Sequence, residues 1–186
     1  ININLDSGYV AAPEDKTPGP RTEPVNLAQY QQIRYVDTVG GSDTPYPAAG
    51  RETAPWKSIS YAISQITNAT SSNRYALLLA KGEYNGGVTV KSWMDIYGGF
   101  AAPGWTRDIE ANLTVVNSIS SPSTTITLSA DTCADGLMIR KSTSLTYSRG
   151  VEITDRSVVS NCWLFSHYSS GTPGAGVRVL GTGPSV

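Results

Sequence analysis

The chain has 186 residues, which suits one domain with an additional segment. Its 14 basic and 15 acidic residues leave a formal net charge of −1, without the clustered Lys and Arg of a broad nucleic-acid surface, so we expect no nucleic-acid partner. No apolar run approaches the roughly 18 residues that a spanning helix needs, so we expect no membrane span. Only 16% of the residues are charged, while Gly (18) and Pro (11) are frequent, which favours a turn-rich all-β protein.

Residues 1–32 are expected to form an extended, Pro-rich arm or linker. The stretch from Ala12 to Pro24 is polar and contains four prolines. This composition favours extended backbone that has no core of its own. The arm is therefore a candidate for reaching a neighbouring molecule. The ordered domain is expected over residues 33–186 and begins with a short strand at 33–37.

One amphipathic helix is expected at residues 58–67. Ser58 can act as its N-cap, and the segment Asn68–Asn73 ends it. A solenoid needs a cap over the apolar end of its first coil, and we expect this helix to supply that cap. The apolar positions of the helix recur at i, i+3, i+4 and i+7, which places one stripe on one face: Ile59, Ala62, Ile63 and Ile66.

Short strands follow the helix. Residues 76–80 are continuously apolar, as expected for a strand buried on both faces. We expect a turn at 82–87, strands at 88–90 and 94–97, and a break at Gly98-Gly99. An excursion is expected at 101–109 before a strand at 113–116.

A repeated strand pattern occupies the last third of the chain. The strand that starts at Ile126 returns 25 residues later at Val151, and Asp135 returns as Ser160 after the same interval. A third copy begins at Val177, after 26 residues. Repeats of this length mark solenoids, in which each unit buries its apolar face by stacking on the next. Because the strands are short and no helix intervenes, we predict a parallel β-helix, right-handed as parallel crossovers almost always are.

The register of this repeat makes specific predictions. Ile126, Val151 and Val177 should form one inward column, and Leu128, Ile153 and Val179 the next, while Thr127, Glu152 and Arg178 point outward. Cys133 lies over Val158, and Cys162 over Leu137. The two cysteines therefore stand in different columns, and we expect small buried thiols in place of a disulfide.

The first half of the chain carries an ordered series of motifs: Tyr35-Val-Asp37, Gly41-Ser-Asp43, Ala54-Pro-Trp-Lys-Ser-Ile59 and Ala80-Lys-Gly-Glu-Tyr84. This series resembles the opening of pectin-lyase-like right-handed parallel β-helix proteins. Two further motifs, Tyr97-Gly-Gly-Phe100 and Trp105-Thr-Arg-Asp108, resemble a subgroup found in bacterial secreted and cell-surface proteins. The resemblance covers about residues 33–186. It implies the fold but does not choose an activity, because the superfamily includes lyases, hydrolases, adhesins and phage tailspikes.

The sequence offers few residues for chemistry. Enzymes of this fold need acidic residues gathered on one face, to hold Ca²⁺ or to flank a glycosidic bond. In the repeat register Asp131 lies over Arg156, and no second carboxylate shares its column, so we expect a surface ion pair. Asp135 and Asp155 are read as solvated turn residues, and the lone His167 as an exposed turn residue. We therefore expect no catalytic residue, cofactor or metal site; Asp43, where metal binding is the alternative, is expected to bond to its own loop backbone.

Aromatic residues are the remaining candidates for contact with a ligand or partner. Trp and Tyr suit sugar faces and protein interfaces alike, because one end is apolar and the other forms hydrogen bonds. The alternative is that these residues cover the solenoid edge or pack under the excursion. The candidates are Trp93, Tyr97, Trp105 and Trp163.

These features together favour a non-catalytic β-helix domain of a secreted or cell-surface protein with a structural, adhesive or assembly role. The alternatives are the N-terminal coils of a polysaccharide lyase or glycoside hydrolase, or a carbohydrate-binding module. Residues 181–186 fall where the register requires another strand pair, so we expect the stack to continue beyond 186. A further coil of the same chain, or a neighbouring chain docked on the open coil, would provide it.

Overall fold

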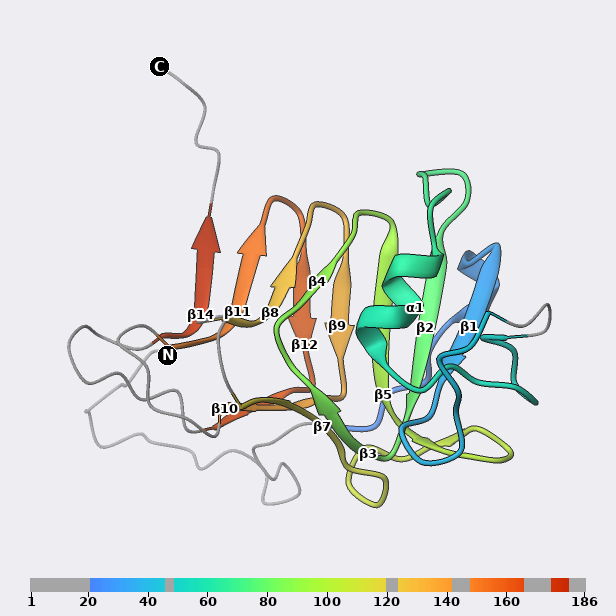
Figure 1. The fold of residues 1–186 in the computed structure, drawn as a ribbon. Helices are drawn as coiled ribbons and strands as arrows, with labels where there is room; N and C mark the ends of the chain where they lie inside the picture. Colours follow the sequence, from blue (N-terminus) through green and yellow to red (C-terminus); the bar gives the residue numbers. More distant parts are fainter. Residues whose placement is uncertain (1–20, 46–48, 120–123, 142–147, 166–174, 181–186) are drawn as a thin grey trace, which may run out of the picture.

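The computed structural model describes residues 21–45, 49–119, 124–141, 148–165 and 175–180 (Figure 1). In these residues the strands form three sheets, and the pairing within each sheet is parallel apart from one two-residue strand. The first sheet contains β1 (Gln32–Val36), β2 (Tyr75–Ala80), β5 (Met94–Ala101), β9 (Cys133–Asp135) and β12 (Val158–Ser160), with β6 (Thr106–Arg107) antiparallel to β5. The second contains β3 (Gly82–Asn85), β7 (Thr114–Ser118), β10 (Met138–Lys141) and β13 (Trp163–Phe165). The third contains β4 (Val88–Val90), β8 (Thr124–Leu128), β11 (Arg149–Thr154) and β14 (Ala175–Leu180).

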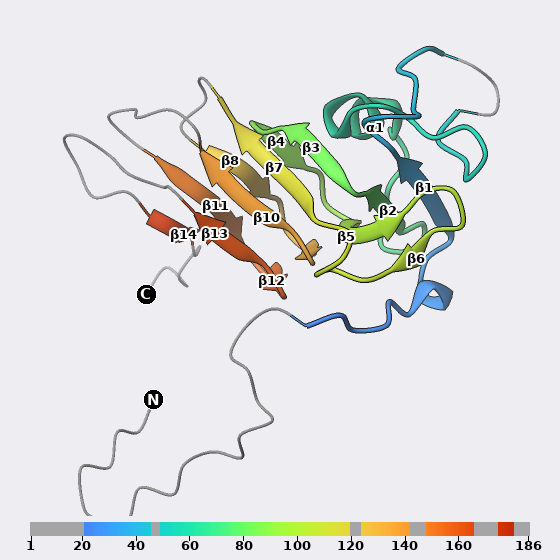
Figure 2. The ribbon, with the colours of Figure 1, turned by 90° about the horizontal axis from the view of Figure 1, so that it is seen from below.

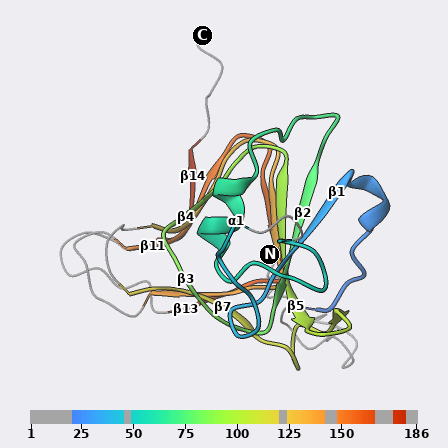
Figure 3. The ribbon, with the colours of Figure 1, turned by 45° about the vertical axis from the view of Figure 1, so that its right-hand side comes forward.

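The chain visits the three sheets in a constant order. From β2 onward, each successive strand enters the first, the second and then the third sheet, with β6 as the excursion, and the cycle repeats to β14. Figure 3, which looks more nearly along the stack, shows the strands of each sheet lying over one another. The fold is thus predominantly β with stacked parallel strands, an arrangement compatible with the predicted parallel β-helix.

The predicted register of the repeat is confirmed. Val151 pairs with Ile126 on one side and with Val177 on the other, and Ser160 pairs with Asp135. The second inward column also forms as predicted, from Leu128, Ile153 and Val179. The 25-residue interval therefore corresponds to one turn of the chain through the three sheets.

The cysteine register is also confirmed. Cys133 pairs with Val158, and the backbone N–H of Trp163 bonds to the carbonyl of Leu137, which places Cys162 beside Leu137. Both thiols are free. They are half-buried, not fully buried as the sequence predicts.

The apolar interior runs along the whole stack, and the helix closes one end of it. The helix α1 (Ile59–Gln65) is capped by the Ser58 hydroxyl, which accepts from the Tyr61 N–H at 3.2 Å. The helix packs against β1 and β4 (Figures 1 and 2). In chain order it replaces the strands that would precede β3 and β4, so it covers the end of the interior that those strands would fill. All four residues of the predicted stripe are buried in the main core: Ile59, Ala62, Ile63 and Ile66.

Two predictions about strand ends are wrong. The expected turn at 82–87 begins with strand β3, because β7, about thirty residues later, supplies backbone partners for it. Gly98 and Gly99 do not break the chain either, since β5 continues through them to Ala101. Gly99, at φ 89°, accompanies a shift in the register between β2 and β5, and β6 then folds back on the end of β5.

Candidate functional site

The outer face of the first sheet carries a connected group of charged and polar side chains. Strand alternation turns Met94, Ile96 and Ala134 into the core. Their neighbours Asp95 and Tyr97 on β5, and Cys133 and Asp135 on β9, therefore lie on the opposite face. Asp95 and Asp135 are nevertheless only 2% and 6% exposed.

Asp95 accepts hydrogen bonds from three different parts of the chain. Its Oδ2 accepts from the Tyr30 hydroxyl and, at 2.9 Å, from the Arg74 guanidinium. Its Oδ1 accepts from the Cys133 backbone N–H at 2.7 Å. The hydroxyls of Tyr30 and Tyr97 lie 2.6 Å apart, and burial followed by the bond to Asp95 raises the pKa of Tyr30 far above its ordinary value. The phenol therefore keeps its proton and stabilises the buried carboxylate.

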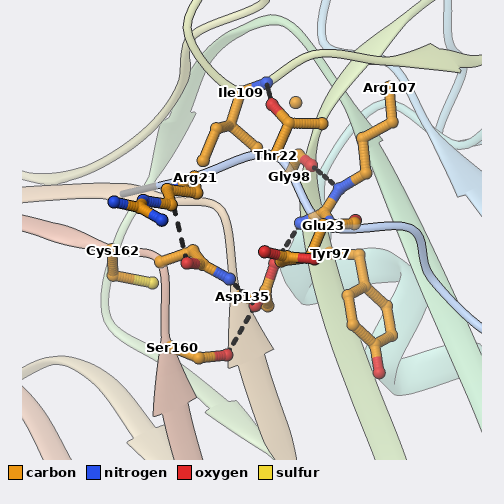
Figure 4. A network of polar contacts seen from close by, with 12 residues as sticks. Arg21, Thr22, Glu23, Tyr97, Gly98, Arg107, Ile109, Asp135, Ser160 and Cys162 are labelled. Carbon is orange, nitrogen blue, oxygen red and sulfur yellow. Dashed lines mark hydrogen bonds and ion pairs between the residues drawn. The ribbon is translucent and has the colours of Figure 1, made fainter. Parts of the chain in front are cut away.

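Asp135 forms a second centre one strand further along the sheet, which Figure 4 shows from close by. It accepts from the Arg107 guanidinium, from the Ser160 hydroxyl and, at 2.8 Å, from the Asn161 amide. Arg107 also donates to the Gly98 carbonyl at 2.9 Å, and its guanidinium lies 5.7 Å from the centre of the Tyr97 ring. The side chains of this ion pair are only 8% and 9% exposed, so solvent screens the charges little.

Two glycines make room for this second centre. A Cβ on Gly136 would lie 2.6 Å from the Arg107 guanidinium nitrogen, and Gly136 has φ 71°, where an L side chain is strained. A Cβ on Gly98 would lie 2.3 Å from the Gly136 carbonyl oxygen. Gly136 thus leaves the space that the Arg107 guanidinium occupies, and Gly98 lets β5 approach the backbone of Gly136 closely.

Residues 21–30 lie across this face, and we call them the strap. Figure 2 shows the strap running past several strands of the first sheet toward the 3₁₀ helix η1 (Leu27–Gln29). At one end, the Arg21 N–H bonds to the Asn161 side chain, beyond β12. At the other, Tyr30 is 7% exposed and reaches Asp95 on β5. The described part of the predicted arm thus packs on its own domain and includes one short 3₁₀ helix.

The Cys133 thiol belongs to the same face. Cys133 packs against the outer apolar cluster that contains Tyr30 and Tyr97. Burial, followed by the charges of Asp95 and Asp135, raises the pKa of the Cys133 thiol to about 11. The thiol is therefore protonated and a weak nucleophile at neutral pH.

The four aromatic candidates from the sequence do not form one row. Tyr97 and Trp105 are buried, and Trp105 stacks edge-on against Tyr35 with ring centres 4.7 Å apart. Trp93 is half-buried, with the Arg74 guanidinium 5.8 Å from its ring centre. Trp163 is half-buried on a different sheet, where it pairs with Met138.

The charged candidates from the sequence also lie in different surroundings and do not form one cluster. Arg156 donates to both carboxylate oxygens of Asp131, at 2.7 and 2.8 Å, so the predicted ion pair between coils is confirmed. Asp155 is exposed beside the same Arg156. The prediction that Asp135 is a solvated turn residue is wrong, because β9 and the Arg107 excursion bury it. His167 lies outside the described residues.

Sequence reasoning missed Asp95, Arg74, Arg107 and Tyr30 as members of this site. Strand alternation was the available signal for Asp95, since it stands between two inward residues of β5. Nothing in the sequence spacing connects Arg107 to Asp135 or Tyr30 to Asp95, which are 28 and 65 residues apart.

Asp43 has a structural partner in another segment. Its carboxylate accepts from the backbone N–H groups of Lys57 and Ser58 at 2.9 and 3.0 Å, and from the Ser58 hydroxyl at 2.6 Å. It holds the residues that start α1, and not its own loop backbone as predicted. A polar cavity of about 360 Å³ opens beside it, lined by Thr38, Asp43, Lys57, Ser58, Glu83, Tyr84 and Asn85.

Within the described ranges, no group of three or more His, Cys, Asp and Glu residues gathers in a way that could hold a metal ion. No helix in the same part of the chain combines the length and apolar character needed to cross a membrane. Comparison with known proteins gave no match to a family model, to a curated protein or to a solved structure.

Proposed function

We propose that this chain is a non-catalytic domain of a secreted or cell-surface protein, with a right-handed parallel β-helix of the pectin-lyase-like kind. Its role is structural or adhesive, through assembly onto the open end of its stack. The constant order of the three sheets supports the β-helix, because each turn of such a helix adds one strand to each sheet in sequence.

One observation carries the assembly role. The inward column that contains the fully buried Ile126 and Val151 reaches Val177 in the last described strand, and this valine is 44% exposed. Its neighbour Val179 is 69% exposed, although Leu128 in the same column is fully buried. Each of β12, β13 and β14 has a strand partner on one side only among the described strands. Apolar side chains beside unpaired strand edges form a template for a further layer of strands.

Sedimentation velocity of this 186-residue chain over a concentration series tests the proposal. We expect concentration-dependent association of the wild-type chain, and loss of that association in Val179→Lys, which places a charge in the exposed column. The matched control is Arg178→Gln on the outward face of the same strand, which should associate like the wild type. Identical sedimentation of all three proteins as monomers would refute assembly through this end.

A polysaccharide lyase or glycoside hydrolase is the second candidate, and one observation favours it. Asp95 and Asp135 lie on one outer face together with Arg74 and Arg107, which is the kind of cluster that such an enzyme needs. Both carboxylates, however, already accept hydrogen bonds from their own chain beneath the strap. The non-catalytic role is therefore the better supported proposal.

Incubation with a panel of acidic and neutral polysaccharides, with and without Ca²⁺, separates the two candidates. We expect no turnover by the wild-type chain. Turnover that disappears in Asp95→Asn or Asp135→Asn while the variant stays folded by circular dichroism, and that persists in the exposed control Asp155→Asn, would establish the enzyme instead.

A further inference from the structure

The strap is held on the first sheet by contacts that do not depend on strand pairing. In the middle of the strap, Pro24, Asn26, Ala28 and Gln29 are exposed. Val25 and Leu27 between them are half-buried and pack against the outer apolar cluster. The hydrogen bonds that attach the strap to the sheet lie at two places, one at each end. A segment attached in this way can be lifted without unpairing any strand of the sheet.

The first attachment is a seat for a tyrosine. The Tyr30 ring packs in the outer apolar cluster, in edge contact with Tyr97 at 6.1 Å between ring centres. Its hydroxyl donates to the buried carboxylate of Asp95, and the Arg74 guanidinium lies 6.0 Å from the ring centre. The seat thus recognises the ring and the hydroxyl of one residue.

The second attachment recognises extended backbone. Arg107 donates to the Glu23 carbonyl oxygen at 2.5 Å, and the backbone N–H of Ile109 donates to the Thr22 hydroxyl at 2.8 Å. The Arg21 N–H donates to the Asn161 side chain at 3.3 Å. Two of these three contacts use main-chain atoms of the strap. This face therefore fits a segment with a hydroxyl residue and, eight positions later, a tyrosine.

We propose that this face is a binding site for a polypeptide segment, and that residues 21–30 of a second copy of this chain can take the place of the cis strap. Every atom that contacts the seat in cis is present in the strap of a neighbour, so exchange conserves these contacts. Two copies that face each other through their first sheets would exchange straps reciprocally, with the chain pivoting near Gln31, directly before β1. The proposal deepens the assembly role above and adds a second, lateral contact to the end-on one.

A peptide-binding experiment tests the site itself. The probe is a fluorescent synthetic peptide of residues 21–31, followed by anisotropy with the full chain. The wild-type strap competes with the probe at a high effective concentration, so the double variant Thr22→Val/Tyr30→Ala should bind the probe at least about tenfold more tightly than the wild type. A probe carrying Tyr30→Phe should lose about tenfold in affinity, because phenylalanine has no hydroxyl group to donate to Asp95.

The matched control is a probe carrying Glu23→Gln, which keeps the backbone carbonyl and should bind like the unchanged probe. If the double variant fails to fold by circular dichroism, Thr22→Val/Tyr30→Phe keeps the ring and replaces it. Equal binding of the probe by the wild type and the strap variant, or equal binding of the probes with Tyr and Phe, would overturn the site.

Sedimentation in the Val179→Lys background separates exchange from end-on assembly. Dimers that persist in Val179→Lys and disappear when Tyr30→Ala is added support exchange. Dimers that disappear in Val179→Lys alone support end-on assembly and overturn exchange. Probe binding without any dimer in Val179→Lys shows that the strap acts only in cis, which also overturns exchange.

Discussion

At the scale of single residues, the most consequential feature is the buried ion pair between Arg107 and Asp135. A buried pair gains little over an apolar replacement, but removing one partner leaves an uncompensated charge in a poorly solvated place. Asp135 also accepts hydrogen bonds from Ser160 and Asn161 in the next layer of the stack. One carboxylate therefore connects the excursion to two successive layers.

Asp135→Asn should therefore lower the free energy of unfolding by about 3 kcal/mol, because Arg107 stays charged without its partner. The exposed Asp155→Asn should change it by less than about 0.5 kcal/mol. Urea denaturation of both variants provides the comparison. Similar midpoints for the two variants would show that the Arg107 pair is not buried in solution.

The raised pKa values of the two thiols predict how the stability of the folded protein depends on pH. The pKa of Cys133 is raised from 9.0 to about 11 in the folded protein, and that of Cys162 to about 12, mainly by burial. The folded state therefore holds these protons more tightly than the unfolded state. The resulting stabilisation is fully present below pH 9.0 and is lost as the pH rises toward about 11.

Urea denaturation at about pH 8 and about pH 10.5 measures this effect. We expect Cys133→Ala to lose less stability between the two pH values than the wild type does. An equal loss in both proteins would assign the alkaline destabilisation to other groups, such as the buried tyrosines.

At the scale of elements, the stacked register determines which strand positions tolerate change. Val151 is fully buried between Ile126 and Val177 on the inward side of β11. Its neighbour Glu152 faces outward and accepts from Arg149 and Arg178, both at 3.3 Å. Adjacent residues of one strand therefore have opposite roles.

Val151→Asp should destabilise the domain by at least about 4 kcal/mol, since it buries an unpaired carboxylate. Glu152→Ala removes two partly exposed ion pairs and should cost about 1 kcal/mol or less. Thermal unfolding of the two variants reports the difference. Equal melting temperatures would contradict the register.

At the scale of the whole molecule, stability should fall from the helix-capped end of the stack toward the open end. β2 is buried on both faces, because the main core lies on one side and the outer apolar cluster lies on the other. β14 has exposed valines and a partner on one side only among the described strands. The two ends of the stack thus differ in both burial and strand pairing.

Amide hydrogen exchange should therefore show the strongest protection in β2 and β5 and the weakest in β13 and β14. Mass-spectrometric exchange on the isolated chain at low concentration measures this gradient. Uniform protection along the stack would mean that the open end is covered in solution.

The sequence alone determined the periodic part of the fold. The 25-residue interval placed Asp131 beside Arg156 and Val151 between its two partners, and the 3.6-residue period identified the buried stripe of α1. These features are readable because identical geometry repeats at a constant interval, so one register predicts every pair. The inward and outward alternation of each strand follows from the same regularity.

Only the tertiary structure decided the outer face of the first sheet. Arg107 reaches Asp135 from an excursion, and Tyr30 reaches Asp95 from a Pro-rich segment that the sequence presents as an arm without a core. Neither contact repeats, so no period predicts it. From the sequence alone, a charged residue at an outward strand position is expected to be solvated. It is buried only if another segment of the chain covers it. Whether such a residue is covered depends on where segments that are distant in the sequence pack. Local propensity does not encode that packing.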